Sequence, residues 1–460
     1  MLASAQILSL PYLANSIEWF ALIRHLPQAI WLDSGRPKSL YGRFDILSAA
    51  PAIVFETRGD TTTISHCDGT GVHSSRDPFQ IIQEYLPATQ TLPDLPFAGG
   101  ALGYFAYDLG RRREKLPQTT LHDIALADMT VGIYPWAIIQ DHQNQTAWLV
   151  INKILAPSYN FLEIEQIVRF HEPRKLINIA DLSFKINKFE SNLNVEKYAE
   201  SLAKIQSYIR AGDCYQVNFA QRFNANYSGD PLAAYLSLRS ALPSPFSAFM
   251  QLSEGAVLSL SPERFIQISG RCVETKPIKG TIARGLTQEE DQRNAAKLQS
   301  SAKDRAENLM IVDLLRNDLS KTCTEVKVPE LFSLQSFANV HHLVSTITAK
   351  LKPDIHGLDV LASSFPGGSI TGAPKIRAME IIEELETTRR SLYCGSIGYI
   401  SACGNMDTNI AIRTLVCDKH KIYCWGGGGI VADSDTEQEY QESIAKVKVL
   451  MDTLEKDSAE

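Results

Sequence analysis

The order of strand-like and helix-like segments is the feature that most restricts the fold of this chain. Short apolar runs separated by Gly, Pro and Asp fill the first 150 or so residues, for example AIWLDSG, YGRFDILSA and PAIVFETRG, and are typical of short strands and turns. Strands and helices then follow one another without the regular alternation that builds a parallel sheet. We therefore predict an α+β fold with largely antiparallel sheets.

The charge and composition exclude several classes of protein. The 460 residues carry a net charge of -7, with 44% hydrophobic and 21% charged residues, and no stretch is rich in Lys and Arg. Nucleic-acid-binding proteins usually present a basic face, so we expect no nucleic-acid partner. No apolar run approaches the roughly 18 residues of a membrane span. We expect a soluble, cytoplasmic protein that binds small molecules or another protein, with no membrane contact.

The cysteines and the N-terminus agree with this interpretation. Eight cysteines are scattered without any C-x-x-C pair, which predicts reduced and mostly buried thiols. The N-terminal segment MLASAQILSLPYLANSIEW lacks the basic region of a signal peptide, so we expect it to form a first strand and helix.

The chain divides near residue 185 in our interpretation. Residues 153–194 have weak periodicity and mixed polarity, which is typical of a connection. We expect a sheet-rich region with an amino-acid pocket at 1–185 and a catalytic region at 186–460, the two intertwined in one body.

Capping signals predict four helices in the second region. The predicted starts are Asn194, with an end at Gly212; Thr287 with Glu290; Ser301 with Asp304; and Ser434 with Glu437.

Two pairs of acidic residues lie at helical spacing. Asp304 and Glu307 share one helix face, and Glu439 and Glu442 share another. Such pairs are most often solvated surface charges. Oxygen ligands of this kind also suit Mg²⁺, and the apolar neighbours Leu309, Met310, Leu314 and Leu315 predict that the first of these helices is largely buried.

Glycine-rich segments recur at 365–379, 393–401 and 423–434. Consecutive glycines let the main chain approach an anion and donate N–H groups to it, although glycine clusters are more often turns and bulges. No nucleotide-binding motif is present. Arg413 is a candidate clamp for a carboxylate, or an ordinary surface charge.

Lys279 and Glu263 also allow two interpretations. Lys279 is inert if it points into water, whereas a desolvated lysine loses its charge more readily and becomes a nucleophile. Glu263 is either a surface acid paired with Arg264 or a buried carboxylic acid that protonates a leaving hydroxyl.

Nine segments together resemble the chorismate-binding enzymes. They are YQVN (215–218), SPERF (261–265), KPIKGT (276–281), AENLMIVDLLRNDL (306–319), HHLVS (341–345), TGAPKIRAME (371–380), YCGSIGY (393–399), NIAIRT (409–414) and GGGGIVADSDTEQEYQE (426–442). The likeness covers about 190 to 455 densely and the first 180 residues sparsely. It implies two packed antiparallel β-sheets flanked by helices, with a Mg²⁺-dependent chorismate site between them.

The resemblance assigns roles to these residues. Glu307 and Glu442 match direct metal ligands, and Asp304 and Glu439 match acids that act through water. Asp304 departs from the pattern: it is one methylene shorter than the glutamate usual in the anthranilate-forming branch, so its carboxylate reaches less far toward the metal-bound water. Substrate-contacting positions match Gly280, Thr281, His342, Thr371, Tyr393, Arg413, Gly427, Gly428, Gly429 and Lys446.

Lys279 indicates the branch of the family. Anthranilate-forming relatives carry alanine there, whereas lysine is typical of relatives that convert chorismate and ammonia to 4-amino-4-deoxychorismate, for 4-aminobenzoate and folate synthesis. In these, the lysine attacks C2 of chorismate while the residue matched by Glu263 protonates the leaving C4 hydroxyl. Isochorismate-forming relatives carry a lysine where this chain has Gln216. No amidotransferase triad is visible, so a glutamine amidotransferase subunit is expected to supply ammonia in a heterodimer.

A second pocket is implied at a distance from the active site. In the family it binds tryptophan, and the matching residues are Ser34, Tyr41, Gly42, Arg43, Phe44, Pro245, Phe246 and Ser247. Two other functions stay open: the large subunit of an anthranilate synthase, and an amino-acid-binding relative without catalytic activity.

Overall fold

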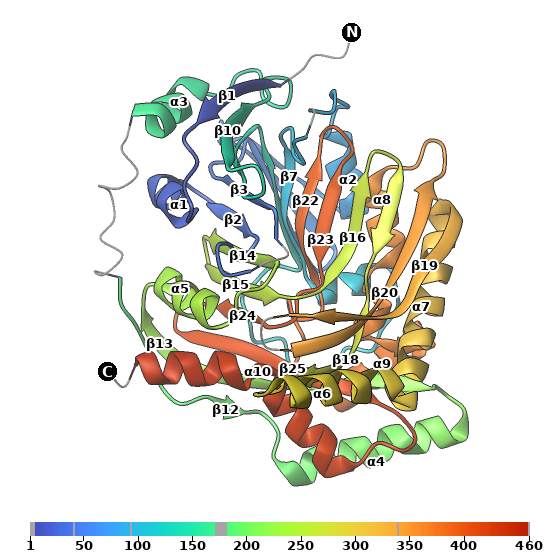
Figure 1. The fold of residues 1–460 in the computed structure, drawn as a ribbon. Coiled ribbons are helices and arrows are strands. Elements are labelled where there is room, and N and C mark those ends of the chain that lie inside the picture. The colour runs from blue at the N-terminus through green and yellow to red at the C-terminus, as the bar shows by residue number, and fades with distance from the viewer. Residues whose placement is uncertain (1–4, 40–41, 93, 171–181, 338–339, 459–460) are drawn as a thin grey trace.

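Two large antiparallel sheets form the centre of the molecule (Figure 1). The structure is a computed structural model that describes residues 5–39, 42–92, 94–170, 182–337 and 340–458. Every pairing between its named strands is antiparallel, which confirms the predicted α+β class.

The first sheet has 13 strands, of which three pair only with β13. Its order is β1 (Gln6–Leu10), β10 (Thr146–Ile151), β9 (Trp136–Asp141), β3 (Phe44–Ser48), β2 (Ile30–Asp33), β14 (Phe246–Leu252), β15 (Gly255–Ser261), β24 (Thr414–Cys417), β25 (Lys421–Ile430), β13 (Gln216–Gly229) and β11 (Phe184–Ile186), with β12 (Glu190–Ser191) and β21 (Gly372–Ala373) beside β13.

The second sheet has 12 strands. Its order is β18 (Ile278–Ala283), β20 (Val340–Leu351), β17 (Cys272–Thr275), β16 (Arg264–Ser269), β23 (Met406–Asn409), β22 (Ser396–Ser401), β7 (Gly100–Phe105), β8 (Met129–Tyr134), β4 (Ile53–Arg58), β5 (Thr61–His66) and β6 (Gly71–Ser74), with β19 (Cys323–Ser336) beside β20. Both sheets combine strands from before and after residue 185, so the two regions are not built from separate sheets. The domain boundary near residue 185 stays a prediction.

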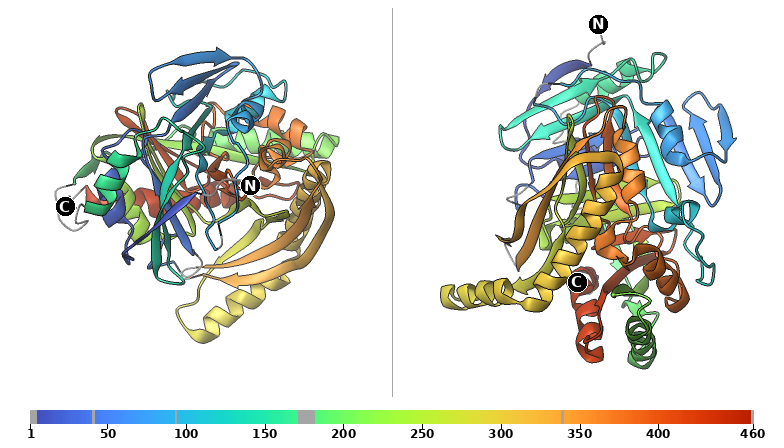
Figure 2. Two further views of the ribbon diagram at one scale, coloured as in Figure 1. Left: turned by 90° about the horizontal axis from the view of Figure 1, so that it is seen from above. Right: turned by 90° about the vertical axis from the view of Figure 1, so that its right-hand side faces the viewer.

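The helices lie around the sheets (Figure 2). They are α1 (Ile17–Ile23), α2 (Pro78–Glu84), α3 (Phe161–Phe170), α4 (Val195–Ala211), α5 (Pro231–Ala241), α6 (Gln288–Ser300), α7 (Ala302–Thr322), α8 (Gly357–Ser364), α9 (Lys375–Leu385) and α10 (Thr436–Asp457), with 3-10 turns η1 (Tyr107–Arg112) and η4 (Gly368–Ile370). The helices α1, α3, α5 and α10 pack buried apolar side chains on the first sheet, including Phe20, Ile164, Leu238 and Leu450. The largest apolar core takes residues from both sheets, such as Val257 and Ile266.

Capping chemistry explains where the helices begin. The side chains of Asn194, Thr287 and Ser301 accept backbone N–H bonds at the starts of α4, α6 and α7, as predicted. For α10 the predicted start at Ser434 is wrong by one residue. Asp435 caps this helix, because the Ser434 hydroxyl bonds to Glu439 instead.

Two further expectations need correction. The segment 153–194 contains the ten-residue helix α3 as well as connecting chain, because residues 161–168 alternate apolar and polar side chains at helical spacing. The helix α7 is only partly buried: Leu315 is buried as predicted, whereas Leu309 is exposed. The buried stripe of α7 instead runs through Ile311, Val312 and Leu319.

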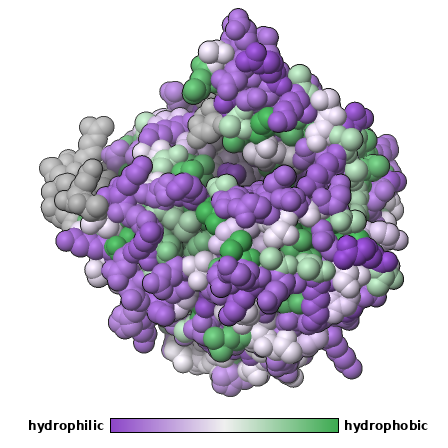
Figure 3. Space-filling view, turned by 90° about the horizontal axis from the view of Figure 1, so that it is seen from below, coloured by the Kyte–Doolittle hydropathy of each residue, from purple (hydrophilic) through white to green (hydrophobic). Residues whose placement is uncertain are grey.

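Most of the cysteines are buried, and the surface mixes hydrophobic and hydrophilic residues (Figure 3). Five of the eight cysteines are buried and none forms a disulfide, as predicted. On the face seen from below, hydrophobic residues are scattered among hydrophilic ones (Figure 3). Within the described ranges, no helix combines the length and the apolar character needed to cross a bilayer.

Candidate active site

Lys279 lies on β18, at the edge of the second sheet. The pairing with β20 shifts by one residue between Lys279 and Thr281, where Gly280 adopts a left-handed conformation with φ +80°. Such a bulge re-aims the neighbouring side chains. The Lys279 Nζ atom lies 3.6 Å from Glu307 Oε2, and the lysine side chain is only 17% exposed. Lys279 is therefore held inside the protein rather than in bulk water.

Gly280 lets the helix α7 approach this strand. A Cβ atom at residue 280 would lie 3.0 Å from the Asp304 Cγ atom, and its positive φ would strain any L side chain. The helix α7 then presents Asp304 and Glu307 to the strand that carries Lys279. The glycine is required for both backbone conformation and space.

The second acidic pair approaches the glycine-rich strand β25. A Cβ atom at Gly428 would lie 3.1 Å from Glu439 Oε2 and 3.8 Å from Glu442 Oε1. Lys446, one turn after Glu442 on α10, donates from Nζ to the Gly427 carbonyl oxygen at 2.8 Å. The first turns of α10 therefore cover the bare backbone of β25.

Gly429 joins the two halves of the site. A Cβ atom there would overlap the Gln216 amide and lie 3.4 Å from Lys279 Nζ. The candidate nucleophile on the second sheet thus lies beside the glycines of the first sheet. The structure brings together Lys279, Gln216 and Gly429, which are far apart in the sequence.

Three of the four acids are each paired with a lysine. The distances are 3.6 Å for Lys279 to Glu307, 3.4 Å for Lys303 to Glu439 and 2.7 Å for Lys446 to Glu442. Burial raises the pKa of Glu307 despite Lys279 and Lys303. Burial acts to raise the pKa of Glu442 too, but Lys446, Lys303 and Lys279 together outweigh it and the pKa of Glu442 is lowered.

The acidic residues fit Mg²⁺ in their chemistry. They supply only hard carboxylate oxygens, from α7 beside β18 and from α10 beside β25, and Mg²⁺ takes one or two such ligands together with water. Among the residues that the structure describes, no three His, Cys, Asp or Glu side chains already stand at metal-ligand spacing. Their oxygens contact lysines and hydroxyls instead.

Glu263 is buried between β15 and β16. Its Oε1 atom accepts a hydrogen bond from Ser369 Oγ at 3.0 Å. Burial raises the pKa of Glu263 to about 7, although Ser369, Lys279 and the Ile278 amide each favour the charged form. A carboxylic acid that is half protonated at neutral pH is suited to proton donation. The alternative of a surface acid paired with Arg264 is excluded, since Arg264 binds Asp407 and Glu274.

His342, Thr281 and Arg413 form a second polar group. The Thr281 hydroxyl and His342 Nδ1 are 2.8 Å apart. Burial and the nearby Arg413 lower the pKa of His342 to about 4, so the ring is neutral at pH 7. Burial also lowers the pKa of Arg413, whose guanidinium has no hydrogen bond or ion pair to any described residue. A desolvated guanidinium of this kind is suited to bind a carboxylate.

Two predicted substrate contacts lie deeper. Tyr393 is buried and stacks on Trp425, with ring centroids 5.9 Å apart. Thr371 is fully buried, and its hydroxyl donates to the carbonyl oxygens of Gly367 and Gly368. Tyr393 thus packs against β25, whereas the Thr371 carbonyl oxygen accepts a hydrogen bond from the Asn218 amide on β13. The contact of both residues with substrate stays a prediction.

Comparison with known proteins identifies the family. The family described as chorismate binding enzyme matches residues 27–452. The chain is 50% identical to aminodeoxychorismate synthase component 1 of Escherichia coli (strain K12), over 95% of this chain and 96% of the relative. It is 48% identical to the protein of the same name from Salmonella typhimurium, over 98% of this chain and 99% of the relative.

This chain belongs to the chorismate-binding enzyme family. The resemblance inferred from the nine segments is therefore confirmed. The crystal structure of anthranilate synthase component I from Streptococcus pneumoniae TIGR4 superimposes with a TM-score of 0.79 at 32% identity, over 90% of this chain and 93% of that one. The predicted fold is confirmed as well.

This chorismate-binding enzyme has a separate cavity between its two sheets. It measures about 670 Å³ and is lined by seven of the eight predicted tryptophan-pocket residues: Ser34, Gly42, Arg43, Phe44, Pro245, Phe246 and Ser247. Tyr41 lies outside the described residues. The opposite wall includes Arg264, the first residue of β16, and the preceding residue Glu263 faces the candidate active site.

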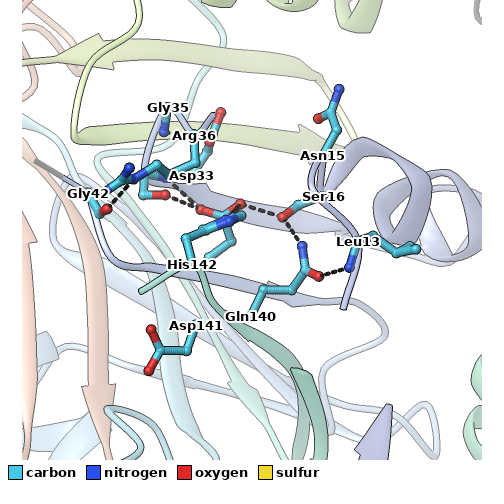
Figure 4. A network of polar contacts seen from close by, with 12 residues as sticks. Leu13, Asn15, Ser16, Asp33, Gly35, Arg36, Gly42, Gln140, Asp141 and His142 are labelled. Carbon is cyan, nitrogen blue, oxygen red and sulfur yellow. Dashed lines mark hydrogen bonds and ion pairs between the residues drawn. The ribbon is translucent and has the colours of Figure 1, made fainter. Parts of the chain in front are cut away.

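A buried polar network supports one wall of this cavity (Figure 4). Asp45 accepts hydrogen bonds from the Ser34 amide at 2.8 Å and the Ser34 hydroxyl at 2.6 Å, and pairs with His142 at 2.9 Å. These bonds lower the pKa of Asp45 even though its burial acts in the opposite direction. The network fixes the orientation of Ser34.

Sequence reasoning missed two residues of the site. Ser369 binds Glu263, but a serine in a glycine-rich turn carries no signal of its partner. Lys303 binds Glu439, and here a signal existed. A cation in the first turn of a helix interacts unfavourably with the helix dipole, so a lysine at this position predicts a nearby carboxylate.

Proposed function

We propose that this chain forms 4-amino-4-deoxychorismate from chorismate and ammonia. The observation that carries the proposal is the position of Lys279, shielded from water between Glu307, Gly429 and the loop of Glu263. The two relatives at 48–50% identity bear the name of this activity. A lysine in this place can act as a covalent catalyst.

In the proposed reaction, two displacements move nitrogen to the para position. The Lys279 amine forms a bond to C2 of chorismate while the ring double bond shifts and the C4 oxygen leaves as water with the Glu263 proton. Ammonia then forms a bond to C4, the double bond shifts back and the Lys279 nitrogen leaves C2. The first displacement needs a protonated Glu263, which a pKa of about 7 supplies at neutral pH.

The remaining polar groups bind and orient the substrate in this proposal. Arg413 and the amides of Gly427, Gly428 and Gly429 bind carboxylate groups, and Thr281 with neutral His342 lines the ring. Mg²⁺ would be held by Glu307 and Glu442, with Asp304 and Glu439 through water. When bound, it neutralises a substrate carboxylate that would otherwise face four acids.

A glutamine amidotransferase subunit would supply the ammonia. The word component in the names of the relatives implies a partner protein. We place the enzyme in the cytoplasm, in the synthesis of 4-aminobenzoate and folate. Heterodimer formation is tested by co-purification of the two chains.

The decisive experiment is to trap the adduct. Incubation with chorismate and Mg²⁺ but no ammonia should add the chorismate ring to Lys279, as detected by mass spectrometry of the intact protein and of its peptides. Lys279→Ala should form no adduct and no para-aminated product. The matched control Lys276→Ala removes a nearby lysine that pairs with Glu274 and should retain both.

Three results would contradict the proposal. Formation of 4-amino-4-deoxychorismate by Lys279→Ala at the wild-type rate would exclude the nucleophile. Formation of anthranilate by the wild type would favour the anthranilate synthase alternative, and no turnover at all would favour a non-catalytic relative.

We also propose that the 670 Å³ cavity binds tryptophan. Its apolar residues Phe44 and Phe246 suit an indole ring, and Arg43 and Ser34 suit the polar end of an amino acid. Calorimetric titration with tryptophan should show binding to the wild type. Asp45→Asn should weaken it, because the Ser34 hydroxyl would lose its charged acceptor. Absence of binding heat with the wild type would refute this assignment.

A further inference from the structure

Lys303 occupies an unfavourable place on its own helix. It is the second residue of α7, after the cap at Ser301, and the N-terminus of a helix carries a partial positive charge. An ammonium group there is repelled by this partial charge and destabilises the helix, unless an anion lies close to it. Acidic residues are the usual choice at such a position.

The compensating anion comes from another helix. Lys303 Nζ lies 3.4 Å from Glu439 Oε1, in the first turn of α10. The Glu439 side chain is only 5% exposed, and it also accepts a hydrogen bond from the neutral hydroxyl of Ser434. A buried carboxylate without a cationic partner is costly, so Lys303 meets the need of Glu439 rather than a need of α7.

The same pattern occurs at two other acids of the cluster. Glu307 has Lys279 and Glu442 has Lys446, but those two lysines also have proposed roles as nucleophile and substrate contact. Lys303 has none. It also lies close enough to Glu307 and Glu442 for its charge to favour their ionised forms and so act to lower their pKa values.

From this placement, and resting on the proposed metal-binding role of the four acids, we propose that the Lys303 ammonium is the internal counter-ion of the metal-free site. It holds Glu439 while no divalent cation is bound, and it competes with that cation for the acidic cluster. Lys303 is thus a positioning residue: it limits the repulsion among carboxylates in the free enzyme and weakens metal binding.

The charges alone decide the direction of this effect. Removal of Lys303 leaves an acidic cluster with a stronger negative potential, which attracts a divalent cation more strongly. The same removal destabilises the metal-free protein. If Lys303 only held α7 and α10 together, its removal would weaken metal binding instead, because the acidic ligands on the two helices would move apart.

The test is a titration with metal alone, without chorismate. Mg²⁺ binding is measured by calorimetry and Mn²⁺ binding by electron paramagnetic resonance, for the full chain and for Lys303→Met. We expect the variant to bind both ions roughly 3- to 10-fold more tightly at low salt, with a smaller difference at high salt. Its melting temperature should fall without metal and recover with Mg²⁺ more than that of the wild type does.

Two variants serve as controls. Lys303→Arg keeps the charge and should behave as the wild type. Lys297→Met removes an exposed lysine of the neighbouring helix α6 and should leave metal affinity unchanged, which separates the local effect from that of net charge. If Lys303→Met does not fold without metal, Lys303→Gln retains a hydrogen-bond donor to Glu439 for the same titration.

Unchanged or weaker metal binding in folded Lys303→Met or Lys303→Gln would overturn this inference and leave the proposed function standing. Failure of the wild type to bind Mg²⁺ would overturn the inference together with the metal part of the proposed function. The adduct on Lys279 is measured separately, so failure of the nucleophile is recognised independently.

Discussion

Lys279 Nζ and Glu307 Oε2 lie 3.6 Å apart, across the gap between an edge strand and the helix α7. The candidate nucleophile therefore contacts a candidate metal ligand directly. The proposed nucleophile and the proposed metal site would therefore share one electrostatic environment, and a change in one is expected to affect the other.

Glu307→Gln should impair both parts of the site. It removes the charge of a proposed ligand, so we expect Mg²⁺ affinity to fall by roughly 10- to 100-fold, as loss of even an outer-shell partner does. Formation of the Lys279 adduct should slow as well. Calorimetry and mass spectrometry measure the two effects. The control Asp313→Asn changes an exposed acid of the same helix, and an equal loss there would contradict a local role.

Ser369→Ala should move the pH dependence of adduct formation. The Ser369 hydroxyl binds the Glu263 carboxylate and thereby opposes the burial that raises the Glu263 pKa to about 7. Glu263 must be protonated to act as an acid, so the rate should fall above pH 7 in the wild type. Loss of the Ser369 hydroxyl raises the pKa of Glu263 further, so the alkaline limb of the pH–rate profile, where the rate falls, should shift to higher pH.

The measurement is the rate of adduct formation without ammonia between pH 6 and 9. Ser363→Ala, whose hydroxyl binds a backbone carbonyl on α8, is the control and should not move the limb. A shift to lower pH in Ser369→Ala would contradict the assignment of Glu263 as acid.

Glu263→Gln should stabilise the fold at alkaline pH while abolishing activity. The pKa of Glu263 rises from 4.5 in the unfolded chain to about 7 in the folded one. Its ionised form therefore destabilises the folded state, increasingly as pH rises from 4.5 to 7 and fully above 7. At pH 8 we expect the variant to be more stable by up to about 3 kcal/mol, and at pH 4.5 nearly equal to the wild type. Denaturant unfolding at the two pH values checks this.

Arg413→Lys should weaken substrate binding more than turnover. A guanidinium makes two parallel bonds to a carboxylate and an ammonium does not, so we expect KM for chorismate to rise about 10- to 100-fold with a smaller change in kcat. Steady-state kinetics gives both constants. Arg316→Lys, on the exposed side of α7, should change neither. A fall confined to kcat would show that Arg413 does not hold the substrate in its ground state.

Local patterns were sufficient for much of the fold. The helix starts at Asn194, Thr287 and Ser301 follow from side chains that accept hydrogen bonds from N–H groups three residues further along the chain. The start of α10 was misplaced because Ser434 bonds instead to Glu439, a carboxylate whose second partner lies on another helix. A competing tertiary contact is invisible to a local rule.

The sequence by itself determined the antiparallel α+β class, the family, and which residues could carry chemistry, because these depend on periodicity, caps and ordered motifs. Only the tertiary structure decided what each residue faces. It placed Lys279 beside Glu307 and Gly429, paired Lys303 with Glu439, and buried Glu263 next to Ser369. Charge and pKa depend on distance and desolvation in space, and these arise only when the two sheets and the helices α7 and α10 pack together.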